Sequence, residues 1–206
     1  MALKVEEACK KCVKSKENVS NCNIFIIKVA EALGIGNYFS GLNADMMIAR
    51  FGSTNAKAPF HYIGPDKTLA MKYADQGYLV LGGLTKSQMN LNKKPSTHPA
   101  TMGHVVIIAP GGPAPARKNV KLANGHTQDL RGDYPYCYQG AHYSAYQFTE
   151  KTQVSCVFPK DHLDDIVYGY VDVPNAEVAF SSASHVDRLL ATHTTQSTSG
   201  AGEPRV

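Results

Sequence analysis

The fold is decided by the stretch Asn21-Cys22-Asn23-Ile24-Phe25-Ile26-Ile27-Lys28-Val29-Ala30-Glu31-Ala32-Leu33-Gly34. Its apolar residues recur at the spacing of one helix face, at positions 22, 25, 26, 29, 30 and 33. We therefore predict a helix over residues 20–33, with Ser20 or Asn21 as N-cap and Gly34 as the stop. Ile24 and Ile27 lie outside that stripe, so the helix is apolar on nearly every side and belongs in the core.

The other apolar patterns place helices first and strands after them. This order predicts an α+β fold in which N-terminal helices pack on an antiparallel sheet. Residues 85–101 are polar and contain proline, which predicts a surface loop, and residues 110–115 predict a Gly/Pro turn. We predict further helices over 6–13, 43–51 and 68–75, and strands over 78–81, 104–108, 121–126, 134–139, 154–158 and 166–173.

The length of the chain suits a single domain of the size of a typical catalytic domain. With 206 residues, 43% of them hydrophobic, it has enough apolar surface for a core of its own. We assign residues 1–180 to this domain. Residues 181–195 have the pattern of one more short helix. Residues 196–206 are rich in Ser, Thr and Gly without an apolar period, so we expect a disordered tail.

Charge and hydropathy exclude several classes of protein. The net charge is +4, but the 21 basic residues are scattered and form no block like a nucleic-acid-binding arm. No stretch reaches the roughly 20 apolar residues of a membrane span, and residues 1–16 lack the apolar segment of a signal peptide. We expect no nucleic-acid partner, no membrane span and no signal peptide.

Cys22 is the candidate nucleophile. A thiol attacks as the thiolate, and the N-terminus of a helix stabilises that anion through its unpaired N–H groups and the helix dipole. The same N–H groups can stabilise the oxyanion that forms when a carbonyl is attacked. A cysteine at the start of an apolar helix is also a common plain core residue, so its position alone does not assign the role.

His104 is the candidate base. It begins the apolar run Gly103-His104-Val105-Val106-Ile107-Ile108, and a strand holds an imidazole more rigidly than a loop does. Strand alternation places His104 on one face with Val106 and Ile108. His98 and His142 are the reserve candidates for the base.

Several ordered motifs resemble the first family of type VI secretion amidase effectors, which are NlpC-like cysteine peptidases that cut peptidoglycan. The resemblance spans residues 8–158. It rests on Ala8-Cys9-Lys10, Asn21-Cys22, Val29-Ala30-Glu31-Ala32-Leu33-Gly34, Asn43-Ala44-Asp45-Met46-Met47, Gln76-Gly77-Tyr78-Leu79-Val80, Gly83-Leu84, Gly103-His104-Val105 and Tyr134-Pro135-Tyr136-Cys137-Tyr138-Gln139-Gly140.

The resemblance implies a papain-like fold of the NlpC type and hydrolysis of the γ-D-glutamyl-meso-diaminopimelate bond of stem peptides. Cys22 would be the nucleophile, His104 the base and Gln139 the group that orients the imidazole. It implies no cofactor and no metal. It also implies a long-range disulfide that joins Cys9 or Cys12 to Cys156; with five cysteines in the chain, Cys137 is a further disulfide candidate.

The same resemblance implies where the protein acts and what it meets. It would be made in the cytoplasm without a signal peptide and exported by the type VI secretion apparatus to the periplasm of a target cell. A cognate immunity protein would block its cleft in kin cells. Residues 85–101 and everything after about Phe158 depart from the family pattern.

Three alternatives remain open at this stage. The spacing Cys9-Lys10-Lys11-Cys12 matches half of a zinc site, but no second Cys/His pair follows at matching spacing. The same Cys/His pair suits a cysteine peptidase, deamidase or acyltransferase that acts on a protein. The third alternative is a non-catalytic, disulfide-bonded, secreted binding domain in which Cys22 is only a core residue; the presence of one fast-alkylating thiol would argue against it.

Overall fold

The computed structural model describes residues 2–91, 100–121, 127–141 and 151–173. The described residues all belong to one compact unit. The helix expected over 181–195 and the tail expected over 196–206 lie outside the described residues.

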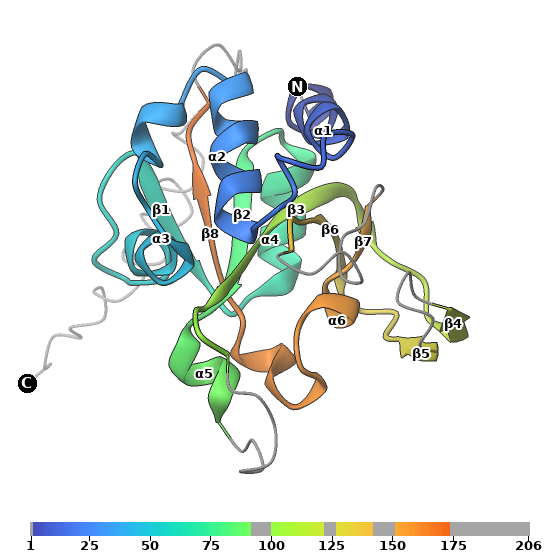
Figure 1. Cartoon of the computed structure of the whole chain (residues 1–206). Helices are drawn as coiled ribbons and strands as arrows, with labels where there is room; N and C mark the ends of the chain where they lie inside the picture. The colour runs from blue at the N-terminus through green and yellow to red at the C-terminus, as the bar shows by residue number, and fades with distance from the viewer. Residues whose placement is uncertain (1, 92–99, 122–126, 142–150, 174–206) are drawn as a thin grey trace, which may run out of the picture. The chain divides into compact units, whose positions relative to one another are not determined.

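One six-stranded antiparallel sheet organises the described residues (Figure 1). Its strand order is β1-β8-β2-β3-β6-β7, and β4 and β5 form a separate pair. The strands are β1 (Phe60–Gly64), β2 (Leu79–Leu84), β3 (His104–Pro113), β4 (Arg117–Lys121), β5 (Thr127–Leu130), β6 (Pro135–Tyr138), β7 (Thr152–Gln153) and β8 (Val167–Val171). The helices are α1 (Ala2–Cys12), α2 (Cys22–Ala32), α3 (Ala44–Phe51), α4 (Lys67–Asp75), α5 (Lys86–Asn90) and α6 (Val154–Val157), with short 3-10 helices η1 (Gly36–Tyr38) and η3 (Lys160–Asp165).

Helices cover both faces of this sheet. Buried residues of α1, α2 and α3 form one hydrophobic cluster with Val105, Ile107 and Ala109 of β3. Buried residues of α4, α6 and η3 form a second cluster with Val106 and Ile108. Alternate residues of one strand therefore face opposite layers, as the pleat requires. The predicted α+β class, with helices packed on an antiparallel sheet, is confirmed.

The predicted central helix is present as α2. Asn21 is its N-cap, in an extended conformation, and the helix ends before Leu33. Phe25, Ile26, Val29 and Ala30 are fully buried, as the apolar stripe predicts. Each Å² of apolar surface that these side chains remove from water stabilises the fold by about 25 cal/mol. This burial fixes α2 against the sheet.

Three local predictions need correction. The strand expected over 154–158 is instead helix α6 (Val154–Val157), because a short apolar run fits either period. Residues 85–101 contain α5, whose N-terminus has a capping box of Thr85 and Gln88, a sequence signature that identifies such a start. The turn expected at 110–115 is largely the end of β3, which continues to Pro113.

In β1 and β5, apolar and polar residues do not alternate regularly enough for a strand to be predicted from the sequence. The strand expected over 121–126 lies outside the described residues except for Lys121, which ends β4. Among the described residues, no helix has the length and apolar character to cross a bilayer.

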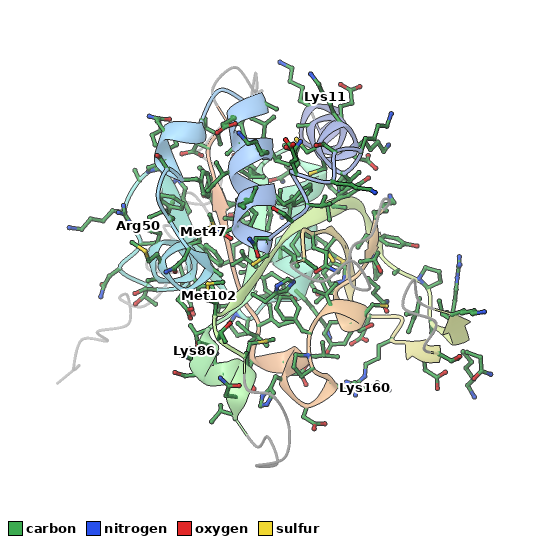
Figure 2. The ribbon with its side chains drawn as sticks, viewed as in Figure 1. Lys11, Met47, Arg50, Lys86, Met102 and Lys160 are labelled. Carbon is green, nitrogen blue, oxygen red and sulfur yellow. The ribbon has the colours of Figure 1, made fainter. Side chains whose placement is uncertain are left out.

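Adjacent methionines of α3 test how the helices contribute to stability. Met47 (Figure 2) is fully buried, whereas Met46 is 47% exposed. Met47→Ala should lower the free energy of unfolding by about 2–5 kcal/mol, because it removes buried methylenes and leaves a cavity. Met46→Ala, the matched control, should change it by less than about 0.5 kcal/mol. Urea denaturation of both variants measures the difference, and equal losses would contradict this packing.

Candidate active site

Cys22 lies at the first position of α2, where the helix N-terminus meets the end of β6. Gly140 makes this approach possible: a Cβ on Gly140 would lie 2.4 Å from the backbone oxygen of Asn21. The next residue, Ala141, donates its N–H to the carbonyl of Val19 at 2.9 Å. The chain before α2 and the chain after β6 are therefore held side by side.

His104 begins β3 and joins the helix to the neighbouring strand. Its Nε2 donates to Oε1 of Gln139 over 2.7 Å, since a carbonyl oxygen can only accept. His104 is also hydrogen-bonded to Cys22, which leaves Nδ1 as the ring nitrogen that faces the thiol. The edge of the ring packs on Phe158 with centroids 5.4 Å apart. The three residues predicted from the sequence, Cys22, His104 and Gln139, are thus brought together.

The surroundings of Cys22 favour its thiolate. Burial by itself raises the pKa of Cys22, but the hydrogen bond from His104 and its positive charge lower it. The backbone N–H groups of Val105 and Asn23 lower it further, and the net pKa lies below the usual range. A helix start and a strand start therefore converge on one sulfur.

His104 responds in the opposite direction. Loss of water around the ring lowers the pKa of His104, but the hydrogen bond and negative charge of Cys22 raise it, and the bond to Gln139 adds to this. The net pKa lies above the usual value for histidine. The pair is therefore biased toward a thiolate and an imidazolium, the form in which a cysteine attacks and a histidine delivers a proton.

The other four cysteines are not activated. Burial raises the pKa of Cys9 and Cys137 well above the usual range, and burial also raises the pKa of Cys12 and Cys156. Cys22 alone among the five has a lowered pKa.

The disulfide expected between Cys9 or Cys12 and Cys156 is not supported, because all five cysteines are free. Cys9 and Cys12 belong to the cluster on the α2 face of the sheet, whereas Cys156 lies in α6, whose buried Val154 belongs to the cluster on the opposite face. Cys137 is likewise a free, buried thiol. The described residues contain no group of three or more His, Cys, Asp or Glu side chains arranged to bind a metal. The reserve bases His98 and His142 lie outside the described residues.

A cavity of about 280 Å³ opens beside the Cys22–His104 pair. Its polar lining includes Asn21, Cys22, His104 and Gln139. The remaining wall is mostly apolar. It comes from α5, the segment before β3, the chain after β6 and α6, with Met89, Ala100, Thr101, Met102, Gly103, Ala141 and Val157. A larger hollow of about 430 Å³ between α1 and the end of α2 contains none of the three predicted site residues.

Asp45 of α3 fixes the backbone that leads into His104. Its carboxylate accepts the N–H of Gly103 at 2.8 Å and the N–H of Lys86 at 2.7 Å. A side chain at position 103 would not fit, because a Cβ on Gly103 would lie 2.7 Å from the carbonyl of Leu84. Asp45 stands in one of the motifs noted in the sequence, but its role was not predicted; an acidic residue in the first turn of a helix was the only signal.

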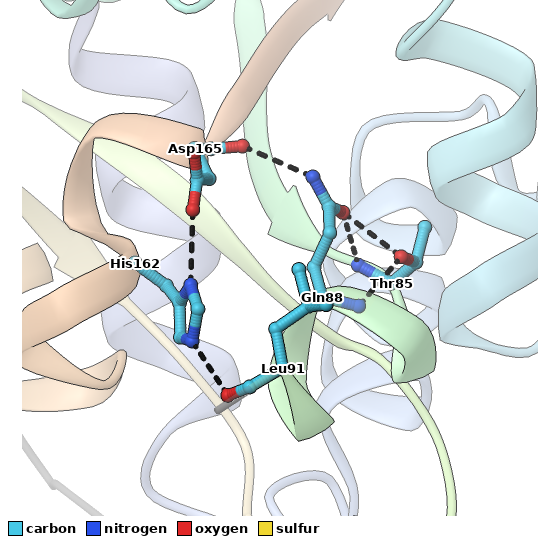
Figure 3. Close-up of polar contacts among 5 residues, drawn as sticks. All are labelled: Thr85, Gln88, Leu91, His162 and Asp165. Atoms are coloured by element: carbon cyan, nitrogen blue, oxygen red, sulfur yellow. Dashed lines mark hydrogen bonds and ion pairs between the residues drawn. The ribbon is translucent and has the colours of Figure 1, made fainter. Parts of the chain in front are cut away.

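Hydrogen bonds join η3 to the α5 segment, which forms part of the cavity wall (Figure 3). His162 is buried, with Nδ1 2.9 Å from the carboxylate of Asp165 and Nε2 3.0 Å from the carbonyl of Leu91. These bonds, to Asp165 first and then to Leu91, raise the pKa of His162. Gln88 of α5 also donates to the carbonyl of Asp165 over 3.3 Å. The partners of His162 are set by tertiary packing, so the sequence pattern gives no sign that this residue is buried.

Comparison of the chain with protein-family models and with curated proteins gives no match. Fold and site therefore define the class by their chemistry: an α+β protein with a hydrogen-bonded thiol, imidazole and amide in the wall of a cavity.

The lowered pKa of Cys22 predicts which thiol reacts first. Near neutral pH, iodoacetamide should label Cys22 before the other four cysteines, because only its thiolate is stabilised. His104→Ala removes the interaction that lowers the pKa of Cys22 most and leaves the effect of burial, which raises it. The pH midpoint of Cys22 labelling should therefore move upward. Peptide mapping by mass spectrometry across a pH series measures both effects. Preferential labelling of another cysteine in the wild type would contradict the assignment.

The role of Asp45, which holds the backbone just before β3, can be tested against Asp75, which holds the backbone near the other end of β3. Asp45→Ala should lower the free energy of unfolding by about 1–3 kcal/mol and slow Cys22 labelling at neutral pH, because His104 loses its fixed backbone. Asp75 accepts the N–H of Gly111 at 2.8 Å and is the positional control. Asp75→Ala should leave the labelling rate unchanged; an equal slowing in both variants would show that Asp45 acts through general stability only.

Proposed function

We propose that the protein is a peptidoglycan amidase that hydrolyses the γ-D-glutamyl-meso-diaminopimelate bond of stem peptides through Cys22 and His104. The observation that carries the proposal is the hydrogen-bonded series Cys22, His104 and Gln139 beside a cavity. A nucleophile, a base bonded to it and a third group that orients the base are the arrangement used for acyl transfer. The choice of substrate is supported by the resemblance of the sequence motifs.

The reaction would proceed through an acyl-enzyme. The Cys22 thiolate attacks the γ-carbonyl carbon, and a carbon–sulfur bond forms as the carbonyl π electrons move to oxygen. The N–H groups of the first turn of α2 have no partner within the helix and can hold this oxyanion. The tetrahedral intermediate collapses with cleavage of the carbon–nitrogen bond, and His104 donates its proton to the leaving amine of diaminopimelate.

The second half of the reaction uses the same residues. His104, now neutral, takes a proton from water, and the resulting hydroxide attacks the thioester. The carbon–sulfur bond breaks, which returns the Cys22 thiolate and the His104 imidazolium and releases the γ-carboxylic acid of D-glutamate. This acid then loses its proton to solvent. Gln139 takes no proton; its Oε1 holds Nε2 so that Nδ1 faces the sulfur in both steps.

The finer classification is part of the same proposal. A helix that presents the cysteine, packed on an antiparallel sheet that presents the histidine and Gln139, is consistent with a papain-like fold of the NlpC type. The motif resemblance supports export by a type VI secretion apparatus, action in the periplasm of a target cell and inhibition by a cognate immunity protein. A non-catalytic binding domain is less favoured, because a plain core cysteine would have no reason for a lowered pKa.

Digestion of purified sacculi tests the proposal. The wild type should release stem-peptide fragments with a new amino terminus on diaminopimelate, identified by mass spectrometry of the muropeptides. Cys22→Ala should abolish this release, and His104→Ala should lower it by at least about 100-fold, the contribution typical of a general acid and base.

Gln139→Asn is the conservative variant, since it keeps the amide but shortens its reach. It should keep more activity than Gln139→Leu, because only an amide oxygen can accept from Nε2. Full activity of Cys22→Ala would rule out the thiol mechanism. An active thiol with unchanged sacculi would instead favour a peptidase, deamidase or acyltransferase that acts on protein.

A further inference from the structure

A third hollow, which we call the basic hollow, lies between the β4–β5 pair and the strands β6 and β7. Its volume is about 250 Å³, and its charged lining residues are Arg117, Lys121 and Lys151. Among the described residues that line it, none is acidic. A concave surface that gathers charges of one sign concentrates the field at its centre, so this hollow attracts anions.

The positive charge of the basic hollow is only partly neutralised. Lys151 lies 3.6 Å from the carboxylate of Glu6, but the same oxygen is 3.2 Å from Lys10, so Glu6 is shared between two cations. No described residue forms an ion pair with Arg117 or Lys121 within 4.0 Å. The ammonium of Lys151 also lies over the ring of Tyr136, 4.9 Å from its centroid, which steadies the lysine at the rim.

The basic hollow is a neighbour of the Cys22 cavity. Cys156 lines the first and Val157, the next residue of α6, lines the second. Tyr136 of β6 lines the basic hollow, and Gln139, three residues further along the chain, lines the Cys22 cavity. Three residues of extended chain span about 10 Å. A substrate peptide extends by about 3.3–3.6 Å per residue, so two or three of its residues bridge the two hollows.

We infer that the basic hollow is an anionic subsite that binds a free carboxylate of the substrate peptide, two or three residues from the bond that is cut. This inference rests on the proposed function, because a stem peptide ends in such a carboxylate on the diaminopimelyl side. Arg117, Lys121 and Lys151 would donate charge-assisted hydrogen bonds to it. The subsite would favour stem peptides with a free carboxyl terminus over those in which that carboxylate is masked.

Two matched peptides test this subsite: alanyl-γ-D-glutamyl-meso-diaminopimelyl-D-alanine as the free acid, and the same peptide as its terminal carboxamide. For the wild type, KM should be about tenfold lower for the acid, with kcat nearly equal. The double variant Arg117→Gln, Lys121→Gln should bring the two KM values within about twofold. Lys118→Gln is the control, since Lys118 is an exposed cation of the same strand that does not line the hollow.

Binding to Cys22→Ala protein, measured by calorimetry, gives the same comparison without turnover. A tenfold preference for the acid that the double variant loses and Lys118→Gln keeps would support the subsite, and this preference should weaken as salt rises. Equal affinity of the wild type for acid and amide would overturn it, as would an equal loss in Lys118→Gln. If both peptides are cut with the same KM, the subsite fails and the proposed function stands; if neither is cut or bound, the proposed function fails as well.

Discussion

The hydrogen bonds of the His104 imidazole are the interaction on which the site depends. One ring nitrogen is hydrogen-bonded to Cys22 at the start of α2, and the other to Gln139, the first residue after β6. A helix from one face of the sheet and two adjacent strands are thereby joined through one side chain. Cys22 and His104 also stabilise each other's charged forms electrostatically: the thiolate stabilises the imidazolium, and the imidazolium stabilises the thiolate.

This arrangement requires backbone segments to approach closely, and small residues allow it. Gly140 brings the end of β6 against Asn21, and Gly103 leaves room for the carbonyl of Leu84 and the carboxylate of Asp45 before His104. A side chain at either position would push the histidine or the amide away from the sulfur. Reaction geometry at the cavity is therefore set largely by residues that do no chemistry themselves.

Much of the fold followed from apolar periodicity. The stripe of α2 predicted its buried residues, and the alternation of β3 predicted that His104 shares a face with Val106 and Ile108. The structure adds that the His104 ring packs against Phe158, which belongs to the same cluster as Val106 and Ile108. Short segments were harder. Residues 154–158 fit a helix or a strand equally well, and the polar α5 has no apolar stripe, so only its capping box reveals it.

The site was predicted in part. Cys22 and His104 could be chosen because a helix start and a strand start each impose a specific environment, and the motif resemblance added Gln139. Contacts that depend on tertiary packing were not accessible: Asp45 holding Gly103, or His162 holding Leu91. The disulfide that the family resemblance implied is not supported for the same reason, since sequence motifs do not show which face of the sheet each thiol occupies.

Titration of His104 by NMR in the wild type and in Cys22→Ala tests the coupled pair most directly. We expect a lower pKa for His104 in the variant, because the thiolate that raises it is gone while the loss of water around the ring remains. A His104 signal that is assigned through His104→Gln and titrates identically in both proteins would contradict the pairing.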